Sequence, residues 1–300
     1  MRVPGRVAAA RFGWWTAHRY LVLRRVAQFG FLAIFLTGPL FGVWIAKGTL
    51  ASSLTLDVLP LTDPMVALQS LLARHIPEAT ALTGAAIVLA AYLLLGGRTY
   101  CSWVCPINPI TDLAAYLRRK LDLDRGAALR PQTRWWVLAL VLVVSAVTGT
   151  IAWEIVNPIT ALWRAALFGV GLGLIGVVAI FLFDLLVARH GWCGHLCPVG
   201  AFYGLIGQVT LLRVSARGRA RCDDCLECFN VCPEMHVIGP ALRGDKYGGG
   251  PVIASGDCTV CGRCIDVCHE RVFALTHRFD DRLDAARTES PRQRLQMEKV

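Results

Sequence analysis

The chain has 300 residues and a formal net charge of +10, and 55% of its residues are hydrophobic while only 17% are charged. Its mean hydropathy of +0.51 is well above what a soluble globular domain needs and is typical of a multi-span membrane protein. A basic excess can serve nucleic acid, but here Lys and Arg gather on one side of the apparent spans, so membrane topology explains the charge and we expect no nucleic-acid partner.

The chain begins with a basic segment, residues 1–28, that contains six arginines and no acidic residue. An apolar stretch follows that is long enough to span a membrane, and no small-residue cleavage site comes after it. We therefore predict a cytoplasmic N-terminus followed by a retained first helix, rather than an export signal.

Four apolar stretches are long enough to cross a hydrocarbon core of roughly 30 Å. These predicted transmembrane helices are Phe29–Ala46, Ala81–Gly97, Trp135–Ile155 and Ala165–Val187. Of the 31 Lys and Arg residues, 28 fall in the segments on one side of them. By the positive-inside rule, the chain is predicted to be a multi-pass protein of the bacterial cytoplasmic membrane, with both termini cytoplasmic.

The longest outer segment, residues 47–80, contains Asp63-Pro64, a pair typical of a helix N-cap and first helical residue. A short amphipathic helix is predicted after it, over Met65–His75. The sequence leaves open whether this helix lies on the membrane surface or packs against the bundle.

A repeat divides the membrane part, residues 29–212. The second and fourth spans are each followed by C-x3-C-P, at Cys101 and Cys105 and again at Cys193 and Cys197. The predicted fold is therefore a mainly α membrane protein in which four transmembrane helices form a duplicated hairpin.

These four thiols point to a third metal or redox site. Cysteines at positions i and i+4 share one face of an α-helix, and the two pairs would meet at the cytoplasmic membrane face. One hypothesis is a third iron–sulfur or other metal site, and another is a dithiol redox pair. Simple packing of small polarisable side chains at helix ends is the alternative.

The strongest motif lies near the C-terminus, where C-x2-C-x2-C-x3-C occurs twice. This spacing predicts a two-cluster ferredoxin-like α+β domain over residues 213–280, followed by a charged and disordered tail, 281–300. In two-cluster ferredoxins the fourth cysteine of each run serves the other cluster. One predicted [4Fe–4S] ligand set is Cys222, Cys225, Cys228 and Cys268, and the other is Cys258, Cys261, Cys264 and Cys232. A pair of zinc sites is the alternative.

Two acidic residues close to the membrane are the weak candidates for a catalytic role. Asp184 is one turn from the inner end of the fourth span, where a carboxylate can accept a proton or contact a quinone headgroup. Pairing with Arg189 or Arg98 is its structural alternative. For Glu154, an ion pair with Arg164 is the default expectation.

The assembled pattern resembles the NapH family, the ferredoxin-type membrane subunits associated with periplasmic nitrate reductase. The resemblance covers nearly the whole chain and includes Gly13-Trp14-Trp15, Leu61-Thr62-Asp63-Pro64, Asn108-Pro109-Ile110-Thr111-Asp112, His190-Gly191-Trp192-Cys193-Gly194-His195, both C-x3-C-P motifs and both ferredoxin runs. The wider family also includes accessory proteins of methylamine utilisation and nitrous-oxide reduction.

The resemblance implies a component of a quinol dehydrogenase rather than a stand-alone enzyme. Quinol in the membrane would be the substrate, and a NapG-like ferredoxin subunit and a tetrahaem or other c-type cytochrome would be the partners that pass electrons to nitrate reductase. Two alternatives stay open: a redox maturation or assembly factor for a metalloenzyme that has no quinol site, and a membrane anchor whose clusters are only structural.

Overall fold

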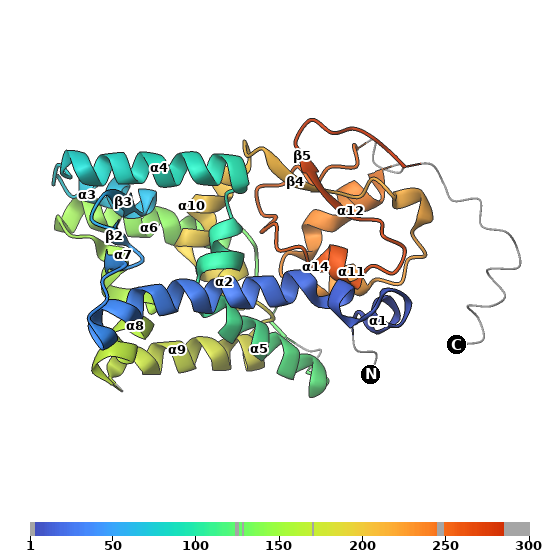
Figure 1. The fold of residues 1–300 in the computed structure, drawn as a ribbon, viewed down its shortest axis with the longest axis horizontal. Coiled ribbons are helices and arrows are strands. Elements are labelled where there is room, and N and C mark those ends of the chain that lie inside the picture. Colours follow the sequence, from blue (N-terminus) through green and yellow to red (C-terminus); the bar gives the residue numbers. More distant parts are fainter. Residues whose placement is uncertain (1–3, 124–125, 128, 170, 245–248, 285–300) are drawn as a thin grey trace, which may run out of the picture. The chain divides into compact units, whose positions relative to one another are not determined.

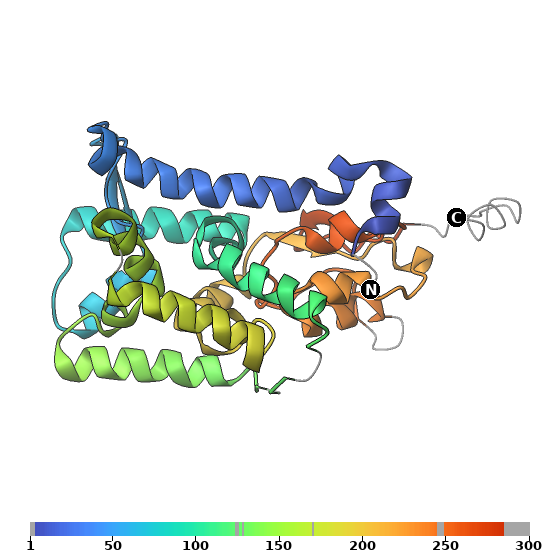
Figure 2. The ribbon, with the colours of Figure 1, turned by 90° about the horizontal axis from the view of Figure 1, so that it is seen from below.

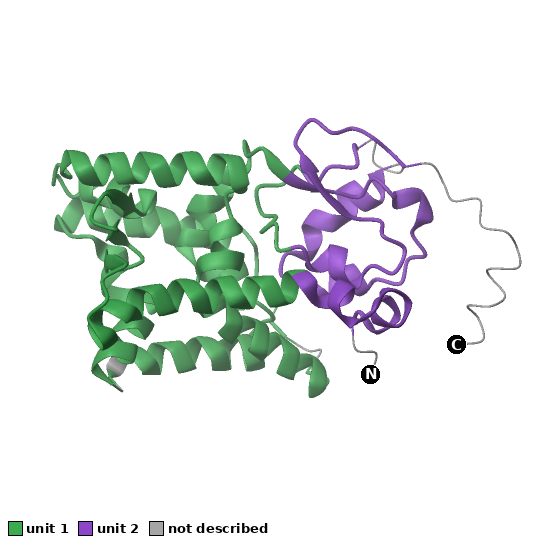
Figure 3. Ribbon diagram, viewed as in Figure 1, with its two compact units in different colours: residues 1, 20–212, 254–261 green, residues 2–19, 213–253, 262–300 purple. Residues whose placement is uncertain are grey.

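The computed structural model describes residues 4–123, 126–127, 129–169, 171–244 and 249–284. The chain forms two compact units (Figure 3). Unit 1 contains residues 20–212 and 254–261, and unit 2 contains 2–19, 213–253 and 262–300. The boundary predicted at residue 28 therefore moves to residue 19, because the first helical residues pack in unit 2. From residue 285 on, the predicted tail lies outside the described residues.

Helix α2, Trp14–Phe41, is the first predicted span and begins 15 residues earlier than expected. Within the described residues it is the one helix that is long and apolar enough to cross a membrane. Helix α4, Ala79–Leu95, has 17 residues, which at 1.5 Å per residue is about 25 Å. The four-span duplicated hairpin accordingly stays a prediction.

The third and fourth predicted spans are shorter than expected because glycines interrupt them. Helix α6 covers Thr133–Thr148 and ends where Gly149 adopts a left-handed conformation (φ 67°), and α7, Ala152–Val156, follows separately. The predicted fourth span is divided into α8, Pro158–Phe168, and α9, Leu172–Leu182, with Gly169 at φ 85° between them. Both left-handed conformations cost little for glycine, so a helix ends there.

In unit 1, α2, α4, α6 and α9 run roughly parallel in both views (Figures 1 and 2). A small antiparallel sheet lies at one end, made of β1 (Ala46–Gly48), β2 (Ser52–Thr55) and β3 (Leu59–Thr62). Its register pairs Ala46 with Thr55 and Ser52 with Thr62. Strand β3 packs on α4, so the outer segment folds back on the bundle.

Helix α3, Pro64–Leu72, confirms the predicted outer helix and its cap, since the Asp63 side chain accepts a hydrogen bond from the N–H of Met65. The helix packs against α4 and α6. Its side chain Gln69 is fully buried and accepts hydrogen bonds from Ser145 of α6 and from the N–H of Trp153 of α7, both at 3.1 Å.

The other end of unit 1 carries the cysteine motifs. Short π-helical turns η1 (Tyr100–Val104) and η3 (Trp192–Leu196) lead into α5 (Ile107–Lys120) and α10 (Pro198–Gly207), and η2 (Phe183–Val187) extends α9. The main apolar core surrounds these turns.

Unit 2 is a small α+β domain, as predicted. Its elements are α1 (Arg6–Phe12), β4 (Leu212–Ser215), η4 (Arg219–Arg221), α11 (Glu227–Val231), η5 (Met235–Val237), α12 (Ile238–Leu242), α14 (Arg263–Val267) and β5 (Ala274–His277). Strands β4 and β5 pair with each other, and α11 packs against α14. Cys228 lies in α11 and Cys264 in α14, and the other cysteines of unit 2 flank these helices in the sequence: Cys222, Cys225, Cys232 and Cys268.

Candidate iron–sulfur sites

The two C-x3-C-P motifs adopt the same local structure. Each is a single π-helical turn, closed by the N–H of Cys105 (3.0 Å) in η1 and of Cys197 (2.9 Å) in η3, which bond to the carbonyl five residues earlier. The prediction of an ordinary α-helical turn is wrong, because the π turn is one residue wider. Such turns are frequent at functional sites.

The four cysteines of these motifs line one enclosed space in unit 1, which we call the thiol pocket. Its cysteines are Cys101, Cys105, Cys193 and Cys197. Most of the remaining wall is apolar or aromatic and includes Trp153, Ile159 and Trp192. The enclosed volume is about 20 Å³. Four soft sulfur donors around a closed apolar space match the ligand preference of iron–sulfur clusters and zinc.

Buried arginines hold the backbone around the thiol pocket. Arg98 donates a hydrogen bond to the carbonyl of Cys193 (3.0 Å). Arg134 donates to the carbonyl of Gly194 (3.2 Å). Arg24 donates to a carbonyl of the first motif, that of Ser102 (3.0 Å). All three guanidinium groups are at most 3% exposed, so their positive charge is available to a negatively charged thiolate site.

The thiols of the pocket are poor acids on their own. Burial raises the pKa of Cys105 and Cys193 well above the ordinary value and that of Cys197 to about 12. A metal or cluster needs thiolates, so its binding releases these protons.

In unit 2, the first predicted ligand set comes together at a second space, which we call the ferredoxin pocket. It is lined by Cys222, Cys225, Cys228 and Cys268 and encloses about 10 Å³. The N–H of Val272 donates to the sulfur of Cys268 (3.3 Å), the kind of contact that stabilises a negative cluster. Cys225 is exposed, and the wall carries the acidic residues Asp223, Asp224 and Glu227.

His269 stands where proline is usual after such a cysteine run. Its Nε2 lies 3.0 Å from the carboxylate of Asp223. Together with Cys225, these residues place one ligand atom each within 4.8 Å of one another. The geometry therefore also admits a single metal ion at the rim of the ferredoxin pocket.

The second predicted ligand set divides between the units. Cys258 and Cys261 belong to unit 1, on the segment 254–261, whereas Cys232 and Cys264 belong to unit 2.

The segment 254–261 is fastened to the first C-x3-C-P motif. Ser102 and Trp103, inside that motif, donate hydrogen bonds to the carbonyls of Thr259 (2.7 Å) and Val260 (3.2 Å). Asp257 forms a 2.5 Å ion pair with Arg134, whose side chain is 1% exposed. Arg98 donates to the carbonyl of Asp257 (3.0 Å). The segment that carries Cys258 and Cys261 thus shares two arginines with the thiol pocket.

A carboxylate that the sequence marked only as a helix cap also lies near the thiol pocket. Asp63 accepts a hydrogen bond from the hydroxyl of Tyr203 (3.2 Å), and Tyr203 stacks on Tyr100 with ring centroids 5.1 Å apart. Tyr100 lines the thiol pocket. Burial raises the pKa of Asp63 to about 6, and the charge of Glu154 adds to the effect. Only tertiary contact brings these residues together, so no sequence pattern could have revealed them.

Asp184 is fully buried at the start of η2. Its Oδ1 accepts a hydrogen bond from the N–H of Trp192 (2.8 Å), while Oδ2 has no hydrogen-bond partner among the described residues. The expected pairing with Arg189 or Arg98 is therefore wrong. A buried carboxylate oxygen without a partner is costly, which makes this residue a functional candidate.

Glu154, by contrast, has a structural role, because both of its carboxylate oxygens are hydrogen-bonded. Its two oxygens accept hydrogen bonds from Asn157 (2.7 Å) and Thr160 (2.8 Å), at the start of α8. The expected ion pair with Arg164 is wrong, because both carboxylate oxygens are bonded to the side chains of Asn157, the N-cap of α8, and Thr160 in its first turn.

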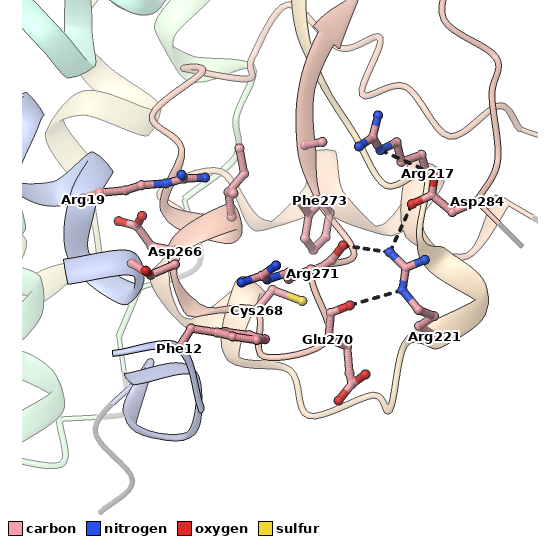
Figure 4. Close-up of a pocket in the computed structure, with 13 residues that line it drawn as sticks. Phe12, Arg19, Arg217, Arg221, Asp266, Cys268, Glu270, Arg271, Phe273 and Asp284 are labelled. Carbon is pink, nitrogen blue, oxygen red and sulfur yellow. Dashed lines mark hydrogen bonds and ion pairs between the residues drawn. The ribbon is translucent and has the colours of Figure 1, made fainter. Parts of the chain in front are cut away.

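Unit 2 has a larger pocket beside Cys268, of about 460 Å³ (Figure 4). Arg221 in its wall forms an ion pair with Asp284 (3.1 Å), and the guanidinium group of Arg271 lies 4.0 Å from the centroid of the Phe12 ring. These contacts tie α1 to the loop after α14. They leave open space next to the fourth cysteine of the ferredoxin pocket.

Two family models of known proteins match the chain. A family model described as a 4Fe-4S binding domain matches residues 79–123 and 170–219, the two segments that contain the C-x3-C-P motifs. A second, described as a 4Fe-4S dicluster domain, matches residues 221–272.

Two relatives are similar over nearly their full length. The chain is 50% identical to the ferredoxin-type protein NapH of Escherichia coli K12 over 93% of this chain and 96% of the relative. It is 54% identical to the methylamine utilization ferredoxin-type protein MauN of Paracoccus denitrificans over 91% and 95%. No solved structure matches the chain.

Proposed function

The chain belongs to the family of ferredoxin-type proteins that includes NapH and MauN, and from that premise we propose that it is the electron-transfer component of a membrane-bound quinol dehydrogenase. It would pass electrons from ubiquinol or menaquinol towards periplasmic nitrate reductase. A NapG-like ferredoxin subunit and a tetrahaem or other c-type cytochrome would be its partners.

The ferredoxin-type segment would hold two [4Fe–4S] clusters. The four cysteines of the ferredoxin pocket are the proposed ligands of one, and Cys258, Cys261, Cys264 and Cys232 are the proposed ligands of the other. When bound, such clusters accept and donate single electrons. The match to a dicluster model over residues 221–272 supports iron–sulfur over zinc here.

The thiol pocket would hold a third cluster. Like the ferredoxin pocket, it is lined by four cysteines around a small space, about 20 Å³ here and about 10 Å³ there. Arg98 and Arg134 supply positive charge beside thiolates in an otherwise apolar wall. The 4Fe-4S family model that spans both motifs supports the same assignment.

One observation carries the proposal: the segment with Cys258 and Cys261 is bonded directly to the motif that holds Cys101 and Cys105. Ser102 (2.7 Å) and Trp103 (3.2 Å) of that motif donate hydrogen bonds to the carbonyls of Thr259 and Val260 in this segment. These contacts support a relay in which a thiolate site at the C-x3-C-P motifs would lie next to a ferredoxin-type ligand loop.

Oxidation of quinol also releases protons, and Asp184 is our candidate acceptor. Its unpartnered Oδ2 is buried beside the N-terminal end of the second motif. Glu154 is not proposed for this role, because its oxygens are both engaged.

We further propose the multi-pass topology with cytoplasmic termini and clusters. The support is the charge distribution, in which 28 of 31 basic residues fall on one side of the apolar helices. A partner subunit would then have to carry electrons to the periplasmic side. Accessibility of single introduced cysteines at residues 57 and 121 to an impermeant reagent tests this, with opposite sidedness expected.

The alternative is a redox maturation factor for a metalloenzyme that has no quinol site, and the similarity to a methylamine utilization ferredoxin-type protein is compatible with it. Membranes that contain the full chain and its partners distinguish the two. A quinol analogue should reduce the iron–sulfur clusters, seen as the low-temperature magnetic resonance signal of reduced cubanes. Absence of that signal with quinol, while dithionite still produces it, would favour maturation.

A further inference from the structure

An apolar groove runs along the surface of unit 1 and ends beside the thiol pocket. It encloses about 600 Å³ and extends from the end of α7, at Ile155, along α8 and α9 to Leu196. Trp192 and Pro158 line both the groove and the thiol pocket, so these two side chains form the common wall.

Glycine spacing in α9 produces the groove. At Gly173, an added Cβ would lie 3.0 Å from Ala161 of α8, so the two helices are in close contact there. One turn later, a Cβ added at Gly176 would meet nothing within 4 Å. The helices diverge between these positions, and the missing side chain at Gly176 leaves the space open.

The end of the groove at the common wall offers one polar group. The indole of Trp192 is a hydrogen-bond donor, and no hydrogen bond to its Nε1 is present among the described residues. Its backbone N–H is held by Asp184 (2.8 Å), which fixes this residue in place. Phe183, which also lines the groove, precedes that carboxylate in the chain.

We propose that this groove binds the isoprenoid quinol, with the tail along α8 and α9 and the head ring at Trp192. A long apolar tail suits the uniformly apolar lining, and a ring hydroxyl can accept from the indole N–H. The common wall then places the head ring one side chain from the thiol pocket. This inference rests on the proposed function, and it names where that substrate lies.

The test is photolabelling of the full chain in membranes with an azido-quinone, followed by peptide mapping. Label is expected in residues 155–161, 173–183 or 192–196, and excess decyl-quinol should compete for it while added phospholipid should not. Label elsewhere, or label that phospholipid displaces equally, means that lipid alone fills the groove and overturns the proposal.

A Cβ added at Gly176 would meet nothing within 4 Å, and leucine is a better helix former than glycine, so the Gly176→Leu variant should fill the groove and fold. It should raise the quinol concentration for half-maximal labelling at least tenfold. Gly30→Leu is the matched control, a glycine in α2 whose Cβ would also meet nothing, and its labelling should be unchanged. Equal labelling of the two variants contradicts the site.

The two proposals fail separately. If quinol reduces the clusters equally in wild type and Gly176→Leu, the dehydrogenase function stands and the groove is wrong. If quinol never reduces the clusters but labels the groove competitively, the binding site stands and the dehydrogenase function is wrong.

Discussion

The thiol pocket and the ferredoxin pocket offer the same four sulfur ligands in opposite surroundings. The thiol pocket is enclosed by tryptophan, tyrosine and aliphatic side chains, and buried arginines hold its backbone. The ferredoxin pocket has acidic residues in its wall and one exposed cysteine, Cys225. Because solvent and local charge set cluster potentials, equal ligand sets in these two places are suited to different steps.

This difference fits a division of labour. The thiol pocket shares the wall of Trp192 and Pro158 with the apolar groove, which suits exchange with a lipid-soluble donor. The ferredoxin pocket lies beside the open space at Cys268, which suits exchange with a protein partner. Substitutions and reagents that act on one pocket at a time test this division of labour.

The largest effect is expected from the double substitution Cys101→Ala and Cys193→Ala. Removing two of four thiolates should abolish a third cluster, so iron and acid-labile sulfide per chain should fall by about one third, from about twelve atoms to about eight. Chemical iron and sulfide analysis of protein purified without oxygen measures this.

Ser102→Ala is the control for a local disturbance of the first motif, since its hydroxyl is not a ligand. If the iron content is unchanged in the double variant, the thiol pocket holds no cluster. The four cysteines of that pocket would then serve only to pack the interior of unit 1.

The second prediction concerns the link between the thiol pocket and the loop of Cys258. Arg134→Met removes one partner of a buried ion pair and leaves Asp257 without its 2.5 Å contact. Breaking such a pair costs about 3 kcal/mol or more, so denaturation in detergent should show a loss of that order. Arg134→Lys keeps the charge and should lose less. Equal stability of Arg134→Met and wild type would mean that this contact does not fasten the loop.

Local sequence patterns predicted part of the fold and of the candidate site, whereas features that depend on backbone conformation or tertiary contact were not predicted. The cysteine runs, the basic side and the Asp63 cap are local patterns, and the cap is confirmed at Met65. The breaks at Gly149 and Gly169 were missed because average hydropathy continues smoothly across them, whereas backbone conformation does not. Glycine at those positions was the available signal.

The thiol pocket shows the same limit. The spacing predicted that the two cysteine pairs would meet, and they do. It also predicted α-helical turns, whereas both motifs are π turns, in which the hydrogen bond spans five residues instead of four. The Asp63–Tyr203 contact joins residues 140 positions apart, and the partnerless oxygen of Asp184 depends on burial. Neither property is encoded in a local pattern.

The third prediction uses the exposure of Cys225. A chelator should remove iron in two phases, because reagents reach the ferredoxin pocket through its exposed cysteine while the thiol pocket is enclosed. We expect the slow phase to be at least about tenfold slower and to be absent in the Cys101→Ala, Cys193→Ala variant. A slow phase that persists in that variant would assign it to a ferredoxin-type cluster instead.

The fourth prediction has the smallest expected effect and concerns how the stability of the folded chain depends on pH through Asp63, near the thiol pocket. The pKa of Asp63 is raised to about 6 in the folded chain, above its ordinary value of 3.8, so the folded state binds this proton more tightly than the unfolded state. Protonated Asp63 therefore contributes its full stabilisation of the folded state below about pH 4, and this stabilisation is lost as pH rises through about 6. After allowance for its partial exposure, the loss should be about 1 kcal/mol. Asp63→Asn keeps an acceptor for the N–H of Met65 and the hydroxyl of Tyr203, and urea denaturation of this variant should lack that slope between pH 4 and 6. If wild type and variant show the same slope, the group that titrates is not Asp63. The tyrosines that pack between Asp63 and the thiol pocket would then leave this carboxylate as hydrated as one on the surface.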